Sequence, residues 1–331
     1  IAEEHAVTFA TALARSGAKP VFGVYGTFLQ RAYDELWHDL CLNDAPATIL
    51  VFGASIFGTT SETHLSFFDI SMLGGRRQRY AYFGYESGGL EYHADFRPYT
   101  VRQAMADVDA EGFSFTPVQP GSEEEALALK LQESQPCWVD RKPFGFAAAA
   151  ASYTCGAWAA RKDGQFAGYL VANGEKISVS ELVAQEGFGP DALVKAWFLQ
   201  NGLERLTVTI PGWNRPLLAC LSRYAEGMNL TPCEKIHILR YRPVIEALLT
   251  LKGRYTPLAD GELALEADGQ TITVTVKNGA VCVTDGGEDP WKLTHREIHE
   301  LLLSPFALDL QDRAPRGWFP LPWHTPVADT F

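Results

Sequence analysis

The sequence predicts an α/β segment at its N-terminal end, followed by a longer α+β region. Residues 2–52 alternate helical and strand-like patterns, which is the order found in sheets with crossover helices. Residues 157–284 instead mix strands, tight turns and helices. Between the two regions, the residue pattern changes at the sequence Gly-Gly-Arg-Arg over 74–77, which is typical of a loop. We therefore place a domain boundary after residue 73.

The N-terminal segment contains two helix–strand pairs. Ala6, Phe9, Ala10 and Leu13 recur at helical spacing, and Gly17 follows where a helix would end. The expected elements are a helix over 2–16, a strand over 20–25, a helix over 28–42 and a strand over 47–52. Because about 70 residues cannot cover both faces of a parallel sheet, this segment is only part of such a sheet.

The middle of the chain is expected to form a second layer of strands and helices. We expect residues 98–145 to be irregular, except for a helix that starts at Ser122 and carries Glu123, Glu124 and Glu125 in its first turn. The elements expected beyond it are strands over 165–171 and 176–179 joined by a turn at 173–174, a helix over 190–201, a strand over 204–210, a helix over 215–226 and a strand over 235–240. The expected domains after residue 73 are 74–96, 97–240 and 241–331.

The last domain opens with a helix at Tyr241 and continues with three strands, over 262–266, 271–277 and 280–284. Asn278-Gly279 predicts a tight hairpin between the last two strands. Thr294 and Glu297 have the spacing of a capping box at the start of another helix. A tail rich in proline and aromatic residues, 315–331, ends the chain.

Composition restricts the function. Among 331 residues, 47% are hydrophobic and 21% charged, so the chain can bury a core. The 28 basic and 40 acidic residues give a net charge of −12, which disfavours binding to nucleic acid and to anionic membranes. No apolar run is long enough to span a bilayer. We expect a soluble protein acting on small molecules, with a homo-oligomer left open.

Six cysteines are scattered without C-x-x-C spacing. This pattern predicts free thiols in a reducing cytoplasm and no structural zinc site. The chain starts at Ile1 inside a helical pattern and without an initiator Met, so we expect the sequence to begin partway through a protein.

A first set of candidate site residues lies near the N-terminus: Glu3, Tyr25, Phe28, Arg31 and His64. A carboxylate at a helix start, aromatic side chains after a strand and a histidine in a later loop could grip and protonate a flat heteroaromatic ring. The alternative is ordinary helix-start charge and packing aromatics.

The sequence motifs around these residues point to a more specific family. Ile1–Ala10, Tyr25–Asp34 and Thr63-His64 with Phe68-Asp69-Ile70 closely resemble 1-deoxy-D-xylulose-5-phosphate synthases over residues 1–73, in their transketolase-like pyrimidine-binding domain. The resemblance implies thiamine diphosphate as cofactor. Glu3 would bond its aminopyrimidine and promote ylide formation, Tyr25 and Phe28 would line the pyrimidine pocket, and Arg31 and His64 would face the sugar-phosphate substrates.

The resemblance also has gaps. The family usually has an acidic residue where Thr60 stands and an arginine where Gly53 stands. The Gly-Asp-Gly…Asn element that binds the diphosphate through Mg²⁺ is missing, since Asp285-Gly286-Gly287 lacks the asparagine. Alone, this segment is not expected to catalyse the synthase reaction.

A second motif lies at the boundary, where Tyr80 precedes Phe83-Gly84-Tyr85-Glu86. It resembles the last motif of GCN5-related (GNAT) N-acetyltransferases. With the domain order of residues 75–331, it resembles the enhanced-intracellular-survival type, which has a degenerate second GNAT domain and a sterol-carrier-protein-like domain. The resemblance implies acetyl-CoA as co-substrate and Tyr80 as general acid. The alternative is a strand edge.

In the same resemblance the C-terminal carboxylate, here that of Phe331, is the general base for an acceptor amine. Trp318, Phe319 and Trp323 could anchor the tail that carries it. A carboxylate is ionised at neutral pH and can accept a proton. The alternative is a frayed terminus.

The acetyl-CoA loop of this family is also missing. No Arg/Gln-x-x-Gly-x-Gly/Ala turn precedes Arg76, and Gly187-Phe188-Gly189 is too short and lacks the basic residue. His295 and His299 are four residues apart on an expected helix, a spacing that suits zinc. Because Glu297 is expected to cap this helix, we expect no metal site here.

The sequence thus predicts a composite of two partial transferases. Because the acetyltransferase resemblance covers the larger part of the chain, we expect the chain to be of the acetyl-CoA-dependent N-acetyltransferase lineage. We also expect it to be inactive alone. The alternatives are a fragment of the thiamine diphosphate-dependent synthase of isoprenoid precursor synthesis and a non-catalytic binding protein.

Overall fold

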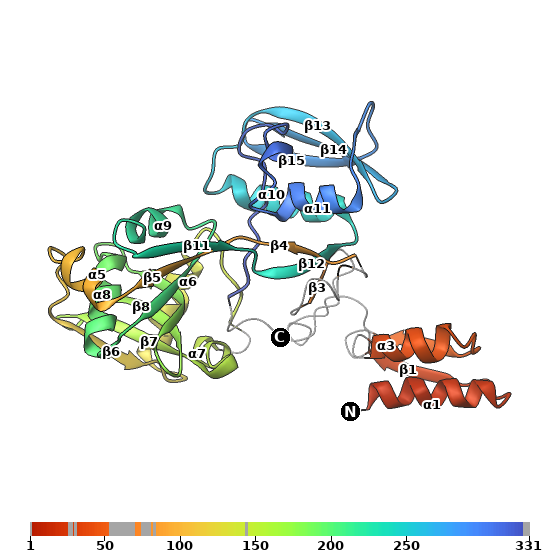
Figure 1. Ribbon diagram of the computed structural model, residues 1–331, viewed down its shortest axis with the longest axis horizontal. Helices are drawn as coiled ribbons and strands as arrows, with labels where there is room; N and C mark the ends of the chain where they lie inside the picture. Colours follow the sequence, from red (N-terminus) through yellow and green to blue (C-terminus); the bar gives the residue numbers. More distant parts are fainter. Residues whose placement is uncertain are drawn as a thin grey trace. The chain divides into compact units, whose positions relative to one another are not determined.

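The computed structural model describes residues 2–25, 29, 32–52, 70–73, 81, 84–142 and 145–326. The chain forms two compact units, Ile1–Ser71 and Met72–Phe331, which we call the small and the large unit (Figure 1).

The small unit pairs two strands in parallel. Its elements are α1 (Glu3–Arg15), β1 (Val21–Tyr25), α3 (Tyr33–Glu35), a π-helical turn (Leu36–Cys41) and β2 (Thr48–Phe52). β1 and β2 run in register from Val21 opposite Thr48 to Tyr25 opposite Phe52, so the predicted parallel arrangement is confirmed. The buried side of α1 carries Val7 and Ala10, whereas Phe9 is 57% exposed.

The large unit is built on a seven-stranded sheet with the order β11-β5-β10-β9-β8-β7-β6. The bounds of these strands are β5 (Glu91–Phe96), β6 (Phe113–Pro117), β7 (Cys155–Lys162), β8 (Gln165–Asn173), β9 (Ser178–Ala184), β10 (Leu206–Pro211) and β11 (Gly227–Thr231). All neighbours are antiparallel except β9 and β10, which are parallel.

The segment 98–145 contains the predicted helix, α6 (Glu123–Glu133), but the expectation that the rest is irregular was wrong. It also contains α5 (Pro98–Gln103) and β6, and α7 (Phe146–Ala150) follows after residue 145. Strand β6 is only five residues long and lies at the sheet edge, paired with β7. Such a short segment has too little periodicity to predict, and pairing with β7 decides its conformation.

β8 shows why this sheet has a core on each face. Leu170 faces one hydrophobic cluster, while Tyr169 and Val171 face another, and all three side chains are fully buried. Alternation with period two therefore places apolar groups on both sides of the strand. Gly168 adopts φ +143, and a Cβ there would lie 2.3 Å from the Val183 carbonyl oxygen, so no larger residue fits.

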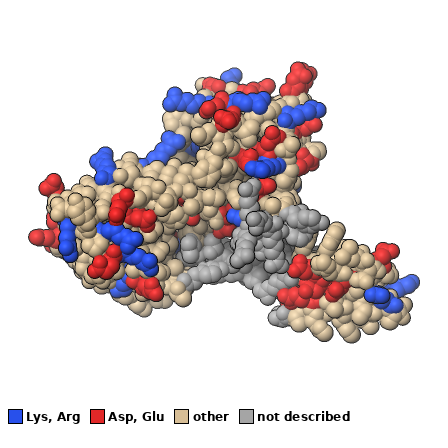
Figure 2. All heavy atoms as spheres, viewed as in Figure 1, with Lys and Arg blue, Asp and Glu red and all other residues tan. Residues whose placement is uncertain are grey.

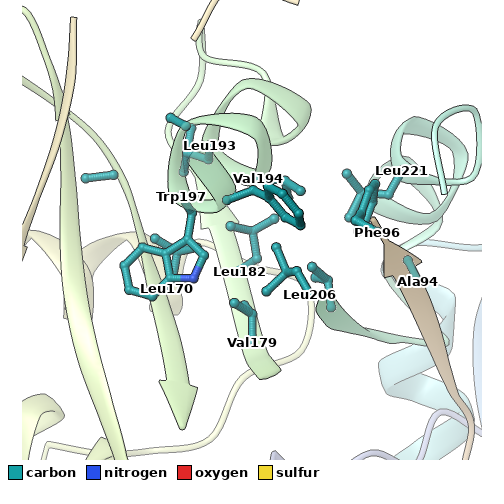
Figure 3. Packing of buried hydrophobic residues seen from close by; sticks show 14 of the residues in the cluster. Ala94, Phe96, Leu170, Val179, Leu182, Leu193, Val194, Trp197, Leu206 and Leu221 are labelled. Carbon is teal, nitrogen blue, oxygen red and sulfur yellow. The ribbon is translucent and has the colours of Figure 1, made fainter. Parts of the chain in front are cut away.

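The first of these clusters is formed largely by α8 (Pro190–Gln200) against the sheet. Figure 3 shows Trp197 of α8 beside Leu170, with Val194 and Leu182 close by. The Trp197 indole Nε1 donates to the Lys176 carbonyl oxygen at 3.1 Å, so the buried indole keeps a hydrogen bond.

The helix ends follow local sequence signals. Ser122 caps α6 by accepting a hydrogen bond from the Glu125 amide, and Pro190 opens α8, both as predicted. Asn214 caps α9 (Arg215–Leu221) by accepting from the Leu217 amide, and this helix ends five residues before the predicted Glu226.

The C-terminal part holds a four-stranded sheet with the order β15-β14-β13-β16. The strands of this sheet are β13 (Gly261–Ala267), β14 (Gln270–Lys277), β15 (Ala280–Asp285) and β16 (Trp291–Lys292), and the helices of this part are α10 (Tyr241–Gly253), α11 (His295–Leu303) and α12 (Leu308–Gln311). A separate three-stranded sheet has the order β3-β12-β4, with β3 (Ile70–Leu73), β4 (Glu86–Gly88) and β12 (Glu234–Ile238). The predicted hairpin is confirmed, with φ of 51° at Asn278 and 78° at Gly279. The predicted capping box of Thr294 and Glu297 starts α11.

All six cysteines are free thiols, as predicted. None of the described helices is long and apolar enough to cross a membrane. Acidic and basic side chains are interspersed over the visible described surface (Figure 2).

Candidate functional site

In the small unit, the predicted cofactor residue Glu3 is buried at the start of a helix. Glu3 lies in the first turn of α1, where the helix dipole favours a carboxylate, and it is only 5% exposed. Its Oε2 atom has no hydrogen-bond partner among the described residues. A buried acceptor without a hydrogen-bond partner lowers the stability of the fold. Glu3 Oε2 is therefore available to accept a hydrogen bond from a ligand.

The other residues of that set lie wholly or partly outside the described part of the chain. Tyr25 ends β1, but its side chain is not described. Phe28, Arg31 and His64 lie outside the described residues, as do Tyr80 and Phe331 of the acetyltransferase set.

The C-terminal tail is anchored through residue 323. Trp318 is fully buried, and its Nε1 donates to the Ala259 carbonyl oxygen at 2.9 Å. Lys252 Nζ donates to the carbonyl oxygens of Trp318 (3.3 Å) and Pro320 (2.7 Å), and burial lowers the pKa of its ammonium to about 7. The Leu321 amide donates to the Leu302 carbonyl oxygen at 2.6 Å. The Trp318 indole and these backbone contacts therefore hold the described part of the tail, whereas residues 327–331 lie outside the described chain.

One strand–turn–helix connection of the large unit leads from β9 into α8. β9 and β10 pair only through Ser178 with Thr207 and Val179 with Val208. The turn over 185–189 then leads into α8. A helix start after a strand is a common anion site, because free amides point outward there.

The charges around this helix start oppose an anion. A cavity of about 400 Å³ beside it is lined by the carboxylates of Asp107, Asp109 and Asp191, with Lys162 as the basic residue. Lys162 already pairs with Asp109 at 2.5 Å. The residues present therefore do not fit the pyrophosphate of acetyl-CoA.

The helical histidine pair is fully hydrogen-bonded. His299 accepts a bond from the Ile238 amide at Nε2 (2.9 Å) and donates from Nδ1 to the His295 carbonyl oxygen (2.8 Å). His295 contacts Asp268 Oδ2 through Nδ1 (2.7 Å) and the Gly84 carbonyl oxygen through Nε2 (2.8 Å). Both rings hold their neighbours together, and neither offers a free nitrogen to a metal.

Burial also determines the charge of His299. It lowers the pKa of His299 to about 4, with a smaller contribution in the same direction from His295 and His237. His299 is 1% exposed and is therefore neutral at pH 7.

A different cluster could hold a metal ion. Glu91, Cys233 and His324 each place one potential ligand atom within 4.8 Å of the other two. Burial, with the nearby Glu91 and Glu234 carboxylates, raises the pKa of the Cys233 thiol to about 12. Residue spacing does not indicate this cluster, because its members lie in three segments that are far apart in the chain. Only the alternation of β5, with Tyr92, Ala94 and Phe96 opposite Glu91, His93 and Asp95, could have indicated a strand there.

Comparison with known proteins separates the two units. Residues 1–76 match the family described as transketolase, pyrimidine binding domain. The 1-deoxy-D-xylulose-5-phosphate synthase of Halothermothrix orenii is 53% identical over 73 residues, which make up 22% of this chain and 12% of that protein. The chain thus spans about 12% of the length of this curated relative.

Two solved structures are similar over most of the chain. A GCN5-related N-acetyltransferase from Kribbella flavida is 18% identical, with a TM-score of 0.45 and coverage of 70% of this chain and 60% of that one. A probable N-acyltransferase from Enterococcus faecalis is 16% identical, with a TM-score of 0.48 and coverage of 71% and 62%.

Proposed function

We propose that this chain joins parts of two transferases and that its large unit is of the acetyl-CoA-dependent N-acetyltransferase lineage. The observation that carries the proposal is the position of the division. The compact units separate between Ser71 and Met72, and the synthase-like stretch covers the first 73 residues. A join between two unrelated parts accounts for both boundaries at once.

In the acetyltransferase half we assign Tyr80 as general acid toward the departing thiolate. The carboxylate of Phe331 is the general base that takes the proton of an acceptor amine. The anchoring of Trp318 and of the Trp323 backbone supports a tail held in a defined place. The C-terminal domain, 241–331, is the sterol-carrier-protein-like part of this lineage.

We further propose that the chain is inactive alone toward acetyl-CoA. The turn 185–189 lacks the basic residue and the spacing that grip pyrophosphate, and the helix start beside it is surrounded by Asp107, Asp109 and Asp191. Like charges there oppose a pyrophosphate rather than attract it.

The second candidate function belongs to the small unit. Glu3 is buried with an unpartnered oxygen, which suits a bond to the aminopyrimidine of thiamine diphosphate. Tyr25 and Phe28 would line that pocket, and Arg31 and His64 would face substrate. Diphosphate binding through Mg²⁺ has no matching motif in this chain, so this half is also proposed to be incomplete. A non-catalytic cytoplasmic binding protein is the third candidate.

Titration calorimetry on the full chain distinguishes the three candidates. Acetyl-CoA and thiamine diphosphate with Mg²⁺ are added separately, and release of free CoA is followed with a panel of primary amines. We expect no CoA release. Turnover would contradict the proposed inactivity, heat from thiamine diphosphate that Glu3→Gln abolishes would favour the second candidate, and silence from both ligands would leave the third.

Thermal unfolding tests the composite itself. If the two parts are unrelated, they should unfold in two independent transitions, one for each unit. A single cooperative transition of the whole chain would contradict a join at residue 73.

A further inference from the structure

Three segments that are far apart in the chain meet at the end of β5. Glu91 is the first residue of this strand, Cys233 lies in the connection between β11 and β12, and His324 lies in the C-terminal tail. Glu91 Oε2 and His324 Nδ1 are 3.6 Å apart, and all three potential ligand atoms lie within 4.8 Å of one another. A carboxylate, a thiol and an imidazole therefore converge on one point.

Backbone hydrogen bonds fix this convergence. The Leu90 amide donates to the Trp323 carbonyl oxygen at 3.1 Å, which places His324 beside Glu91. The Cys233 thiol lies 3.7 Å from the same carbonyl oxygen. The three segments are thus held by contacts that do not involve the converging side-chain atoms of Glu91 and His324.

Gly89 leaves room for the thiol. It adopts φ +82, and a Cβ at this position would lie 2.4 Å from Cys233 Sγ and 3.1 Å from the Trp323 carbonyl oxygen. Any larger residue would be strained in this backbone conformation and would displace the sulfur.

Nδ1 of the His324 imidazole has no hydrogen-bond partner among the described residues. The side chain is 5% exposed, and Nδ1 is buried. Buried polar atoms are nearly always satisfied, and leaving one unsatisfied costs about 1–3 kcal/mol. The 3.6 Å separation from Glu91 is too long for a hydrogen bond but close to the separation of two ligands on one ion.

A neighbouring histidine orients the carboxylate. His93 and Glu91 are two residues apart on one strand and point to the same face of the sheet. His93 Nε2 lies 3.2 Å from Glu91 Oε1 and 2.9 Å from Thr231 Oγ1, and its Nδ1 lies 3.4 Å from Thr209 Oγ1. One oxygen of Glu91 is held by His93, while the other faces His324. Supporting contacts of this kind are usual around metal ligands.

We propose that Glu91, Cys233 and His324 bind one Zn²⁺ ion, which fastens the C-terminal tail to the sheet of the large unit. Thiolate, imidazole and carboxylate ligands together suit zinc, with bonds of about 2.0–2.3 Å. Tetrahedral geometry with these bonds requires ligand separations of about 3.3–3.6 Å. The Glu91–His324 pair already meets this value, and the sulfur closes the remaining gap by side-chain movement.

Binding changes one covalent bond at the protein. The S–H bond of Cys233 breaks, the Zn–S bond forms, and the proton passes to solvent. The imidazole and the carboxylate bind without further proton loss in their neutral and ionised forms. The fourth position is left for water.

The test uses the purified full chain after treatment with EDTA. Zn²⁺ is titrated against a chromophoric chelator, and Co²⁺ is used separately because a thiolate ligand gives a sulfur-to-cobalt charge-transfer band. We expect one ion per chain and such a band. Cys233→Ser should remove the band, and each of Cys233→Ser, His324→Gln and Glu91→Gln should weaken zinc binding by about 100-fold or more.

Matched controls separate this site from surface binding. Cys282→Ser changes an exposed cysteine in β15, and His5→Gln changes an exposed histidine of α1. Both should bind zinc as the unchanged chain does. Cys233→His should keep zinc while losing the charge-transfer band, which shows that loss of the band does not report unfolding. Near-UV circular dichroism checks the fold of every variant.

Three results would overturn the proposal. The first is no stoichiometric zinc binding by a natively folded chain, and the second is unchanged affinity in Cys233→Ser. The third is alkylation of Cys233 by iodoacetamide at equal rates with and without zinc, which would identify an accessible thiol with a neighbouring base rather than a metal ligand.

Discussion

Two histidine clusters in the large unit differ in one respect that decides their chemistry. In the first, every ring nitrogen of His295 and His299 has a partner, and the pair joins α11 to β12 and Gly84. In the second, His324 Nδ1 is buried without a partner beside Glu91 and Cys233. The comparison teaches that histidine spacing on a helix says little about metal binding. What matters is whether the fold leaves a nitrogen unused.

The largest expected effect concerns the pH dependence of the satisfied cluster. In the folded chain His299 takes up a proton only near pH 4, whereas in the unfolded chain it does so near its ordinary pKa of about 6.5. Its contribution to stability is complete above pH 6.5 and is lost as the pH falls toward 4. This difference amounts to about 3 kcal/mol.

Urea unfolding of the large unit at pH 7 and pH 4 measures this loss. His299→Gln keeps an acceptor for the Ile238 amide but cannot titrate, so its stability should fall less between the two pH values. His5→Gln, at an exposed position, should behave as the unchanged chain does. Equal pH dependence in His299→Gln and the unchanged chain would show that His299 is not buried neutral.

Zinc should affect only the unsatisfied cluster. At a concentration 100-fold above its Kd, a ligand that binds the folded state raises the free energy of unfolding by about 2.7 kcal/mol. We expect zinc to raise the Tm of the large unit, EDTA to reverse the rise, and His324→Gln to abolish it. His299→Gln should still respond fully. A lost response in His299→Gln instead would reverse the assignment of the two clusters.

Asp268 tests how the satisfied cluster is held. Its Oδ2 accepts hydrogen bonds from His295 Nδ1 at 2.7 Å and from the Tyr241 hydroxyl. Although burial opposes ionisation, these two bonds hold the pKa of the Asp268 carboxyl below its usual value. Asp268→Asn should cost about 1.5 kcal/mol at pH 7, reduced because Asp268 is 33% exposed.

The sign of that effect follows from the lowered pKa. The carboxylate stabilises the fold above the unfolded-state pKa of about 3.9, and this contribution is lost as the pH falls through the lower folded-state value. The deficit of Asp268→Asn should therefore shrink in acid, as measured by urea unfolding at pH 7 and pH 3. Zinc affinity should not change, and a changed affinity would mean that the two clusters are coupled.

The smallest effect is expected at the start of α11, which carries both histidines of the satisfied cluster. Thr294 Oγ1 accepts a hydrogen bond from the Glu297 amide at 3.3 Å. Thr294→Ala removes this cap and should cost about 1 kcal/mol, whereas Thr294→Ser should be nearly neutral. Thermal unfolding at pH 7 compares the two variants, and equal losses in both would mean that the hydroxyl does not stabilise the helix.

Local signals in the sequence predicted much of the fold. The caps at Ser122 and Thr294, the proline at the start of α8 and the Asn278-Gly279 hairpin each act within four residues, so they can be recognised without the rest of the chain. Strand β6 was missed because it is short and depends on pairing with β7. Strand β5 was missed although its polar–apolar alternation was present in the sequence.

The candidate sites also differ in how much of each could be predicted from the sequence. Motif order in the first 73 residues was sufficient to identify the synthase-like segment, since identity over a continuous stretch needs no tertiary information. That the helical pair His295 and His299 binds no metal stays a prediction, and the hydrogen bonds that occupy both rings could be seen only in the fold.

By itself, the sequence determined the synthase-like segment over the first 73 residues, the caps and the hairpin, because each of these depends on neighbouring residues. Only the tertiary structure decided that Glu91, Cys233 and His324 meet, because Cys233 comes 142 positions after Glu91 and His324 comes 91 positions after Cys233. It also decided which polar atoms are buried without a partner. Burial is a property of the packed chain, and it distinguishes a histidine that holds a fold together from one that is free to bind an ion.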